Sequence, residues 1–289
     1  MKDAAELAAE AAEALAGPDF RPRDSRGRPG GLLELPSDLE LAVIGDLHAC
    51  GGNLDLILAH RGNRAALEGG RLRLLFLGDA VHNDVDYREM DTSILLIERI
   101  MALIAGHPGR VFYLRGNHDS FGDDVMKGGV LQGLEFGAAV LRRRGRDCLA
   151  AMQLFFDRLP LAALGEGFLA VHAGPPRGGC GRGELIEALS SPALAMQLVW
   201  NRAAGYPGWP AGMTYAEGDL ASARSRLGLG PRAHVIVGHT PLGDIEATGG
   251  FWRDAFGYSG HHILFSAARS RAPYLSITAS ELRLHFAKE

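Results

Sequence analysis

Short apolar runs alternate with longer segments of helical length along most of this chain. The runs Leu39 to Ile44, Leu72 to Leu77 and Arg110 to Leu114 each have the length of a buried strand. The stretches between them, Asn53 to Leu67 and Thr92 to Ile104, have the length and apolar content of helices. Strands that alternate with helices in this way favour parallel pairing in an α/β sandwich.

More strands are predicted in the second half of the chain, and the last has a pattern of its own. Residues Glu281 to Ala287 alternate between apolar and polar side chains, as in an antiparallel edge strand. The others are expected at Phe168 to Val171, Ala233 to Val237, Ile263 to Ser266 and Tyr274 to Ile277.

The first part of the chain differs in composition from the rest. Residues 1–16 are rich in Ala and Glu and predict a helix that ends at Gly17-Pro18. The polar run from Arg21 to Gly31 predicts a linker, or an arm lying on the domain surface. We therefore divide the chain into an N-terminal helix and linker extension, residues 1–38, and a main domain, residues 39–289.

Composition and charge narrow the functional classes. The formal net charge of -4 gives no reason to expect a nucleic-acid partner, because such proteins usually carry a basic face. Three cysteines without a CxxC pair are too few for a disulfide framework, which favours a reducing compartment. Acidic residues interrupt the N-terminal apolar stretch, and no segment has the roughly 20 uncharged apolar residues of a membrane span. We expect a cytoplasmic protein without membrane contact, and the sequence predicts no oligomeric state.

Side chains that can bind metal follow five of the predicted strands. They are Asp46 and His48, then Asp79, then Asn117 and His118, then His172, and finally His239. Ligands bind at the carboxyl ends of strands in open α/β sheets, so these groups are expected to converge. The remaining histidines lack this context and are expected to be structural.

The chemistry of the set, apart from His118, indicates the kind of metal. Two carboxylates, three imidazoles and one amide oxygen suit Mn, Fe or Zn better than Ca. Six ligands are too many for one open tetrahedral site, but they are enough for two ions about 3.5–4 Å apart that share a carboxylate.

The sequence around these residues resembles a known signature. The segments Gly45-Asp-Leu-His48, Gly78-Asp-Ala-Val81, Leu114-Arg-Gly-Asn-His-Asp119, Val171-His-Ala-Gly174 and Gly238-His-Thr-Pro241 resemble, in order, the motifs of the serine/threonine phosphoprotein phosphatases. Ile263 to Ala267 is similar to the terminal strand of that family, so the resemblance spans roughly residues 39 to 280. It implies a calcineurin-like metallophosphoesterase, a four-layer α/β/β/α sandwich with a binuclear metal site at the strand C-terminal ends.

The resemblance also implies roles for the matching residues. Asp46, His48 and Asp79 would hold one divalent ion, and Asp79, Asn117, His172 and His239 the second, with Mn favoured over Fe or Zn. A hydroxide held between the ions would attack phosphorus, because metal binding lowers the pKa of water. His118 would protonate the leaving alkoxide, and Arg202 would bind the phosphate. No phosphoenzyme is expected.

The second motif departs from the family pattern. The family continues with Asp-Arg-Gly, whereas this chain has His82-Asn83-Asp84. The missing Asp normally orients the general-acid histidine, and Asp84 or Asp86 is the alternative here. The missing Arg normally binds phosphate with two hydrogen bonds, and Asn83 would supply a single uncharged one.

Two further segments are candidates for the walls of the site. The loop Gly205 to Gly212 would line the substrate cleft or pack on the surface. The insertion Phe121 to Leu164 would cap the active face, and its Arg142-Arg-Arg144 would steer anionic substrates or form a solvated helix face.

These features lead to three functional hypotheses. The first is a metal-dependent phosphomonoesterase acting on phosphoserine or phosphothreonine in proteins, or on small phosphate esters. The second is a phosphohydrolase of dinucleoside polyphosphates or other nucleotides, which the same motifs allow. The third, of a different class, is a non-catalytic phosphate-binding or scaffold protein, which the altered second motif would favour.

Overall fold

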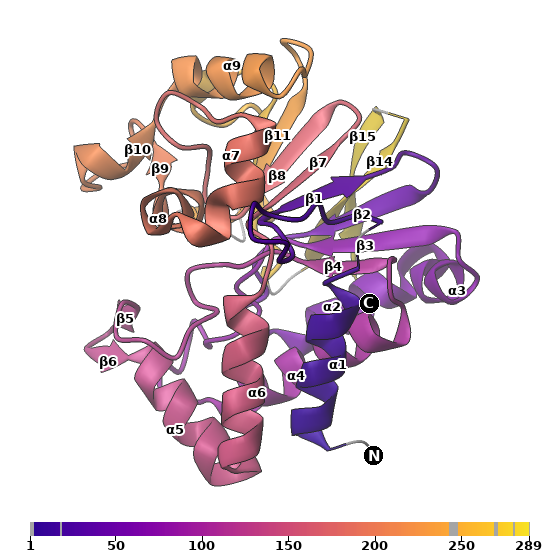
Figure 1. The fold of residues 1–289 in the computed structure, drawn as a ribbon, viewed down its shortest axis with the longest axis vertical. Helices are drawn as coiled ribbons and strands as arrows, with labels where there is room; N and C mark the ends of the chain where they lie inside the picture. The colour runs from indigo at the N-terminus through magenta and orange to yellow at the C-terminus, as the bar shows by residue number, and fades with distance from the viewer. Residues whose placement is uncertain (1–2, 18, 243–247, 269–270, 280, 289) are drawn as a thin grey trace.

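Two β-sheets lie face to face at the centre of the chain, and helices cover both outer faces (Figure 1). The computed structural model describes residues 3–17, 19–242, 248–268, 271–279 and 281–288. Buried side chains from both sheets, among them Val43 and Ile236, share one hydrophobic core. A second core, which contains Val237 and Leu198, lies between the outer face of one sheet and its helices. The predicted α/β/β/α sandwich is confirmed.

Within the described residues, one sheet has five strands and the other has six. In spatial order, the first contains β15 (Glu281–Ala287), β14 (Ala272–Thr278), β2 (Glu40–Ile44), β3 (Leu72–Phe76) and β4 (Val111–Tyr113). The second contains β1 (Leu32–Leu35), β7 (Ala162–Gly165), β8 (Phe168–Val171), β11 (His234–Val237), β13 (His261–Leu264) and β12 (Phe251–Trp252). Short ladders join β5 (Met126–Lys127) to β6 (Val130–Leu131), and β9 (Arg202–Ala203) to β10 (Thr214–Tyr215).

The two layers of helices that cover the sheets come from different parts of the chain. The first group contains α1 (Ala4–Ala14), α2 (Gly51–Ala59), α3 (Asn63–Glu68), α4 (Asp91–Gly106), α5 (Gln132–Arg144) and α6 (Arg146–Asp157). The second contains α7 (Arg182–Ile186), α8 (Pro192–Trp200) and α9 (Glu217–Arg226). Single 3-10 turns are η1 (His60–Gly62), η2 (Glu187–Ser190), η3 (Ala211–Met213) and η4 (Ala255–Gly257). Each helix among the described residues is too short or too polar to span a lipid bilayer.

The predicted parallel pairing holds for the strands that lead into the candidate site. β2, β3 and β4 are parallel, and so are β8, β11 and β13. In contrast, β14 is antiparallel to β2, and β7 to β8. β15 is the predicted antiparallel edge strand. The helix predicted from Asn53 to Leu67 is interrupted, because Arg61 and Gly62 have left-handed backbone angles, with φ of 52° and 73°.

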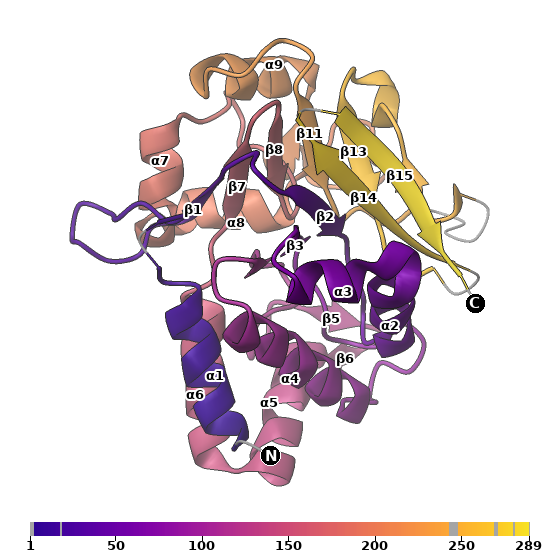
Figure 2. The same ribbon diagram turned by 90° about the vertical axis from the view of Figure 1, so that its right-hand side faces the viewer.

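The N-terminal segment packs closely on the rest of the molecule. α1 lies along α6 and also contacts α4 (Figure 2). β1 pairs in parallel with β7, so part of the segment belongs to the six-stranded sheet. Between them, Arg21 is only 1% exposed, and burial lowers its pKa to about 9. Its guanidinium donates to the backbone carbonyls of Leu15 (3.1 Å), Gly30 (2.6 Å) and Arg158 (2.5 Å).

Arg21 therefore joins the segment to α6, and its loss should destabilise the fold. We expect Arg21→Met to lower the free energy of unfolding by about 2–4 kcal/mol, because three backbone carbonyls lose a charged donor. Urea denaturation at neutral pH measures this change. Arg23→Met is the control, since Arg23 is exposed, and a change within about 0.5 kcal/mol is expected there. Equal losses in the two variants would contradict this role of Arg21.

Candidate active site

The side chains predicted to converge lie together, in the loops that follow strands of both sheets. Asp46 and His48 follow β2, Asp79 follows β3, and Asn117 and His118 follow β4 in the five-stranded sheet. His172 follows β8 and His239 follows β11 in the six-stranded sheet. The candidate site is thus built where the carboxyl ends of parallel strands from the two sheets meet.

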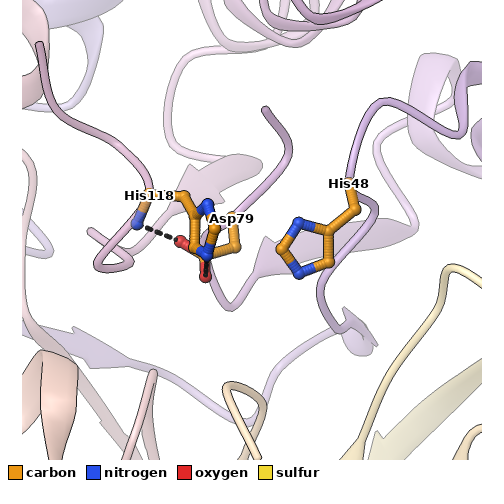
Figure 3. Close-up of side chains that lie close together, drawn as sticks. All are labelled: His48, Asp79 and His118. Atoms are coloured by element: carbon orange, nitrogen blue, oxygen red, sulfur yellow. Dashed lines mark hydrogen bonds and ion pairs between the residues drawn. The ribbon is translucent and has the colours of Figure 1, made fainter. Parts of the chain in front are cut away.

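Asp79 is the residue common to two clusters of possible metal ligands. The ligand atoms of His48, Asp79 and His118 lie within 4.8 Å of one another, and so do those of Asp79, His172 and His239. Figure 3 shows the first cluster, in which the Asp79 carboxylate faces His118. Oδ1 of Asp79 accepts the backbone N–H of His118 at 2.8 Å, and Oδ2 lies 3.1 Å from His172 Nε2. One carboxylate therefore lies between two sets of imidazoles.

Asp46 and Asn117 complete the arrangement. Oδ1 of Asn117 is 3.0 Å from His172 Nε2 and 2.8 Å from His239 Nδ1. Oδ2 of Asp46 is 3.7 Å from His48 Nε2 and accepts the backbone N–H of His239 at 3.0 Å. All six predicted ligands are at most 6% exposed.

The hydrogen bonds on the far side of two imidazoles show that this donor set fits cations. His172 Nδ1 lies 2.9 Å from the carbonyl oxygen of Leu77, and His48 Nδ1 lies 3.2 Å from that of His82. A carbonyl can only accept, so each Nδ1 carries a proton, and in the neutral ring the lone pair is on Nε2. These lone pairs face the oxygens of Asp79, Asn117 and Asp46. Oδ1 of Asp46 is also buried without a hydrogen-bond partner among the described residues. Acceptors that face acceptors need positive charge between them, which divalent ions would provide.

Burial shifts the pKa values of these groups toward their neutral forms. It raises the pKa of Asp46 well above its usual range, and it also raises the pKa of Asp79. Burial likewise lowers the pKa of His239 well below its usual value. Desolvated carboxylates beside neutral imidazoles form a site in which bound cations would offset the cost of burying negative charge.

His118 contacts a second histidine on the side away from the cluster. Its Nδ1 lies 2.8 Å from Nδ1 of His82, which follows β3 and is fully buried. Burial lowers the pKa of His118 well below its usual value, and lowers that of His82 to about 3. The predicted alternative, orientation of His118 by Asp84 or Asp86, is wrong, because Asp86 is exposed and its Oδ1 accepts the backbone N–H of Arg88 at 3.1 Å. Asp84 instead forms an ion pair with Lys127 and lies 3.8 Å from His48 Nδ1.

A cavity of about 360 Å³ opens onto the cluster, and Arg202 lies in its wall. The Arg202 guanidinium stacks over the rings of Trp209 (4.0 Å) and Tyr206 (4.5 Å). Its Nε donates to Nε2 of His239 at 3.3 Å. Trp209 comes from the loop Gly205 to Gly212, so the prediction that this loop lines the cleft is confirmed. The short β9–β10 ladder holds both ends of that loop.

Residues 39–243 match the family model of the calcineurin-like phosphoesterases. The chain belongs to this family. Its members act on phosphate esters, so the protein is a hydrolase of this class, and the scaffold hypothesis is not needed. A search of curated proteins found no match.

Solved structures of other phosphatases share the fold of this phosphoesterase. A serine/threonine phosphatase from Saccharomyces cerevisiae, with similarity to human phosphatase PP5, superimposes with a TM-score of 0.72 at 17% identity, over 99% of this chain and 89% of that one. A cold-active protein tyrosine phosphatase gives 0.57 at 14% identity, over 88% and 78%. The enzyme of that type from a psychrophilic Shewanella species gives 0.54 at 13%, over 88% and 82%. At these identities the likeness establishes the fold alone.

Asp119 is a residue of this phosphoesterase whose role the sequence did not indicate. Its Oδ2 accepts the backbone N–H groups of Asp79 (3.1 Å) and Gly116 (2.8 Å), and its Oδ1 accepts the hydroxyl of Tyr113 (2.7 Å). The loops after β3 and β4 are thereby held together. Gly116 allows their close approach, since a Cβ there would lie 2.0 Å from an Asp79 oxygen. The position of Asp119, directly after His118 in the third motif, was the available signal.

Asn83, the predicted phosphate-binding residue of the second motif, is not among the residues that line the cavity. Its side-chain oxygen accepts the backbone N–H groups of Val85 (2.8 Å) and Asp86 (3.1 Å), which closes a turn. Lys127 of β5 does line the cavity, with its ammonium on Asp84. The cavity of this phosphoesterase is therefore bordered by Arg202 and Lys127, which come from segments far apart in the sequence.

The insertion between the third and fourth motifs contributes to the cavity through residues 124–127, which include β5, rather than through its arginine cluster. Arg143 forms a two-point contact with Asp91 (3.0 and 2.6 Å), and Arg144 forms one with Glu98 (2.6 and 3.0 Å). Both acidic partners are on α4, so these arginines attach α5 to α4. Their charge is compensated there, which argues against the hypothesis that they steer substrate.

Proposed function

We propose that this phosphoesterase is a phosphomonoesterase that uses two divalent ions to hydrolyse phosphoserine, phosphothreonine or related phosphate esters. The observation that carries the proposal is the position of Asp79, whose carboxylate is shared by two clusters of ligand atoms. A shared carboxylate is what a two-metal site requires.

The residues assigned to the ions are those named from the motifs. Asp46, His48 and Asp79 would hold one ion, and Asp79, Asn117, His172 and His239 the other, with Mn the expected metal and Fe or Zn the alternatives. Bound there, the ions would supply an acidified water and would neutralise charge on the phosphoryl oxygens. Within this chain, carbonyl groups fix the tautomers of His48 and His172 before any ion arrives.

Two further residues would act on the substrate itself. Arg202 already lies against His239 and is fixed by aromatic rings, so its guanidinium would bind the phosphate without much loss of side-chain entropy. His118 is 13% exposed and has its Nε2 4.0 Å from Asp79 Oδ2, so it would donate to the leaving oxygen. Lys127 also lines the cavity, but its ion pair with Asp84 compensates its charge, so Arg202 is the cation assigned to the phosphate.

The aromatic lining of the cavity favours one alternative substrate class, dinucleoside polyphosphates or other nucleotides. Trp200 and Trp209 both line the cavity and stack at 6.5 Å with an interplanar angle of 16°. Exposed aromatic faces can stack nucleobases. The face of Trp209 that Arg202 covers is not available for this, so we place the phosphomonoester first.

A parallel assay tests the proposal. Purified protein is stripped with EDTA, supplied with Mn, and tested on p-nitrophenyl phosphate, a phosphoserine peptide and diadenosine tetraphosphate. We expect Mn-dependent phosphate release from the first two and at least about tenfold lower kcat/KM on the third. Faster turnover of the dinucleotide would select the alternative. Activity that is unaffected by EDTA and Mn would overturn the two-metal proposal.

A further inference from the structure

The contact between the rings of His82 and His118 contains a proton that one of the two rings must carry. The two Nδ1 atoms are 2.8 Å apart. Two N–H groups cannot point at each other at this distance, and two bare lone pairs would repel. One proton therefore lies between the rings, and one imidazole donates while the other accepts.

The other nitrogen of His82 decides the direction. His82 is fully buried, and its Nε2 has no hydrogen-bond partner within the described part of the chain. The ring of Phe136 lies edge to face with it, at 5.5 Å between centroids, and an aromatic ring is at most a weak acceptor. An orphaned N–H in such surroundings is rarer and more costly than an orphaned acceptor. The favoured state of His82 has a bare Nε2 and a proton on Nδ1.

His82 is also held rigidly in this position. Its backbone N–H donates to the hydroxyl of Ser93 at 2.9 Å, and Phe136 of α5 covers its ring. Its backbone carbonyl accepts from Nδ1 of His48 at 3.2 Å. The same residue thus contacts one predicted metal ligand through its main chain and His118 through its side chain.

We propose that His82 is a positioning residue, which donates Nδ1–H to Nδ1 of His118 and so fixes His118 in the tautomer that carries its proton on Nε2. That N–H is directed at the cavity, where Nε2 lies 4.0 Å from Asp79 Oδ2. His82 therefore donates a hydrogen bond to His118, whereas a carboxylate at this position could only accept one.

The catalytic consequence rests on the proposed phosphomonoesterase function. As the P–O ester bond breaks, its electron pair goes to the leaving oxygen, and His118 Nε2–H stabilises that charge by a hydrogen bond. Water supplies the oxygen that joins phosphorus, and one of its protons ends on the alcohol. A fixed donor matters most for esters whose leaving oxygen is strongly basic.

Three variants separate positioning from a merely structural role. His82→Leu keeps a side chain of similar size without a donor, whereas His82→Asn places an amide N–H at a similar distance from the backbone. His262→Leu is the matched control, because His262 is also buried and pairs with a histidine, His234, at 2.9 Å, outside the cavity. Each Mn-loaded variant is assayed on phenyl phosphate and on p-nitrophenyl phosphate, whose leaving group is more acidic. Metal content and thermal unfolding are measured alongside.

We expect His82→Leu to lower kcat on phenyl phosphate by on the order of 10²-fold, with KM changed by no more than about twofold. On p-nitrophenyl phosphate the loss should be no more than about tenfold, since that leaving group needs less stabilisation. His82→Asn should recover most of the difference, and His262→Leu should leave the ratio of the two esters unchanged. Equal losses on both esters in His82→Leu would overturn the proposal.

Nitrogen NMR of the isotope-labelled histidine rings provides a readout that does not depend on turnover. The His118 signals are assigned by their absence in His118→Ala. In the wild type we expect protonated Nε2 and bare Nδ1 on His118, and a mixture of tautomers in His82→Leu. Protonated Nδ1 on His118 in the wild type would overturn the direction of donation. If the wild type hydrolysed neither ester, the proposed function would fail, and the NMR result would still decide the role of His82.

Discussion

Asp79→Asn is expected to lower kcat/KM by on the order of 10³-fold or more and to reduce the bound metal below two ions per chain. The carboxylate of Asp79 is shared between both ligand clusters, so a neutral amide weakens both sites at once. The substitution keeps the size of the side chain, and its Oδ1 can still accept the backbone N–H of His118. The loss should therefore reflect charge and metal binding rather than a collapsed loop.

Metal analysis and kinetics are measured on the same preparation of this variant. Asp124→Asn is the control, because Asp124 lines the same cavity but lies outside both ligand clusters. Its kcat/KM should stay within about threefold of the wild type, with unchanged metal content. If Asp79→Asn kept two ions and near-normal turnover, Asp79 would not bridge a metal pair.

Arg202→Ala should cause the second largest loss, on the order of 10²-fold in kcat/KM on a phosphate monoester. The guanidinium is the charged group that adjoins His239, and a phosphate bound there would receive paired N–H donors. Arg202→Lys should recover only part of the loss, since an ammonium lacks the planar fork and stacks less well on Trp209 and Tyr206. Inhibition by inorganic phosphate should weaken in parallel.

Arg253→Lys is the matched control for Arg202. Arg253 also lies over an aromatic ring, that of Phe251 at 5.7 Å, but it does not line the cavity. Its replacement should leave the kinetics and phosphate inhibition unchanged. A full rescue of turnover by Arg202→Lys would mean that charge alone is needed, and that the paired geometry proposed for Arg202 is not used.

The sequence predicted the strands that carry the site because each is a short apolar run followed directly by polar residues. Asp46, Asp79 and His172 could be named from that pattern and from their motifs. Lys127 could not, because its place beside the cavity depends on the β5–β6 hairpin and on Asp84, and no local periodicity indicates this. β1 was missed for a related reason, since Leu32–Leu35 is short and follows a polar run that resembles a linker.

The altered second motif shows most clearly what could not be predicted from the sequence alone. Charge considerations alone favoured Asp84 or Asp86 as the partner of His118, because a carboxylate stabilises an imidazolium and a second imidazole does not. The tertiary structure instead directs Asp84 toward Lys127 and buries His82 against His118. The contacts of His82 with Phe136 of α5 and Ser93 of α4 depend on tertiary packing, which the sequence of the loop does not indicate.

The proposed ligands come from both sheets, and this affects how cooperatively the molecule unfolds. β2, β3 and β4 supply Asp46, His48, Asp79 and Asn117, whereas β8 and β11 supply His172 and His239. The ion assigned to Asp79, Asn117, His172 and His239 would couple the unfolding of one half to that of the other, since neither half could separate without releasing it. Amide hydrogens of both sheets should then exchange with solvent as one cooperative unit in the loaded protein, and more independently after chelation.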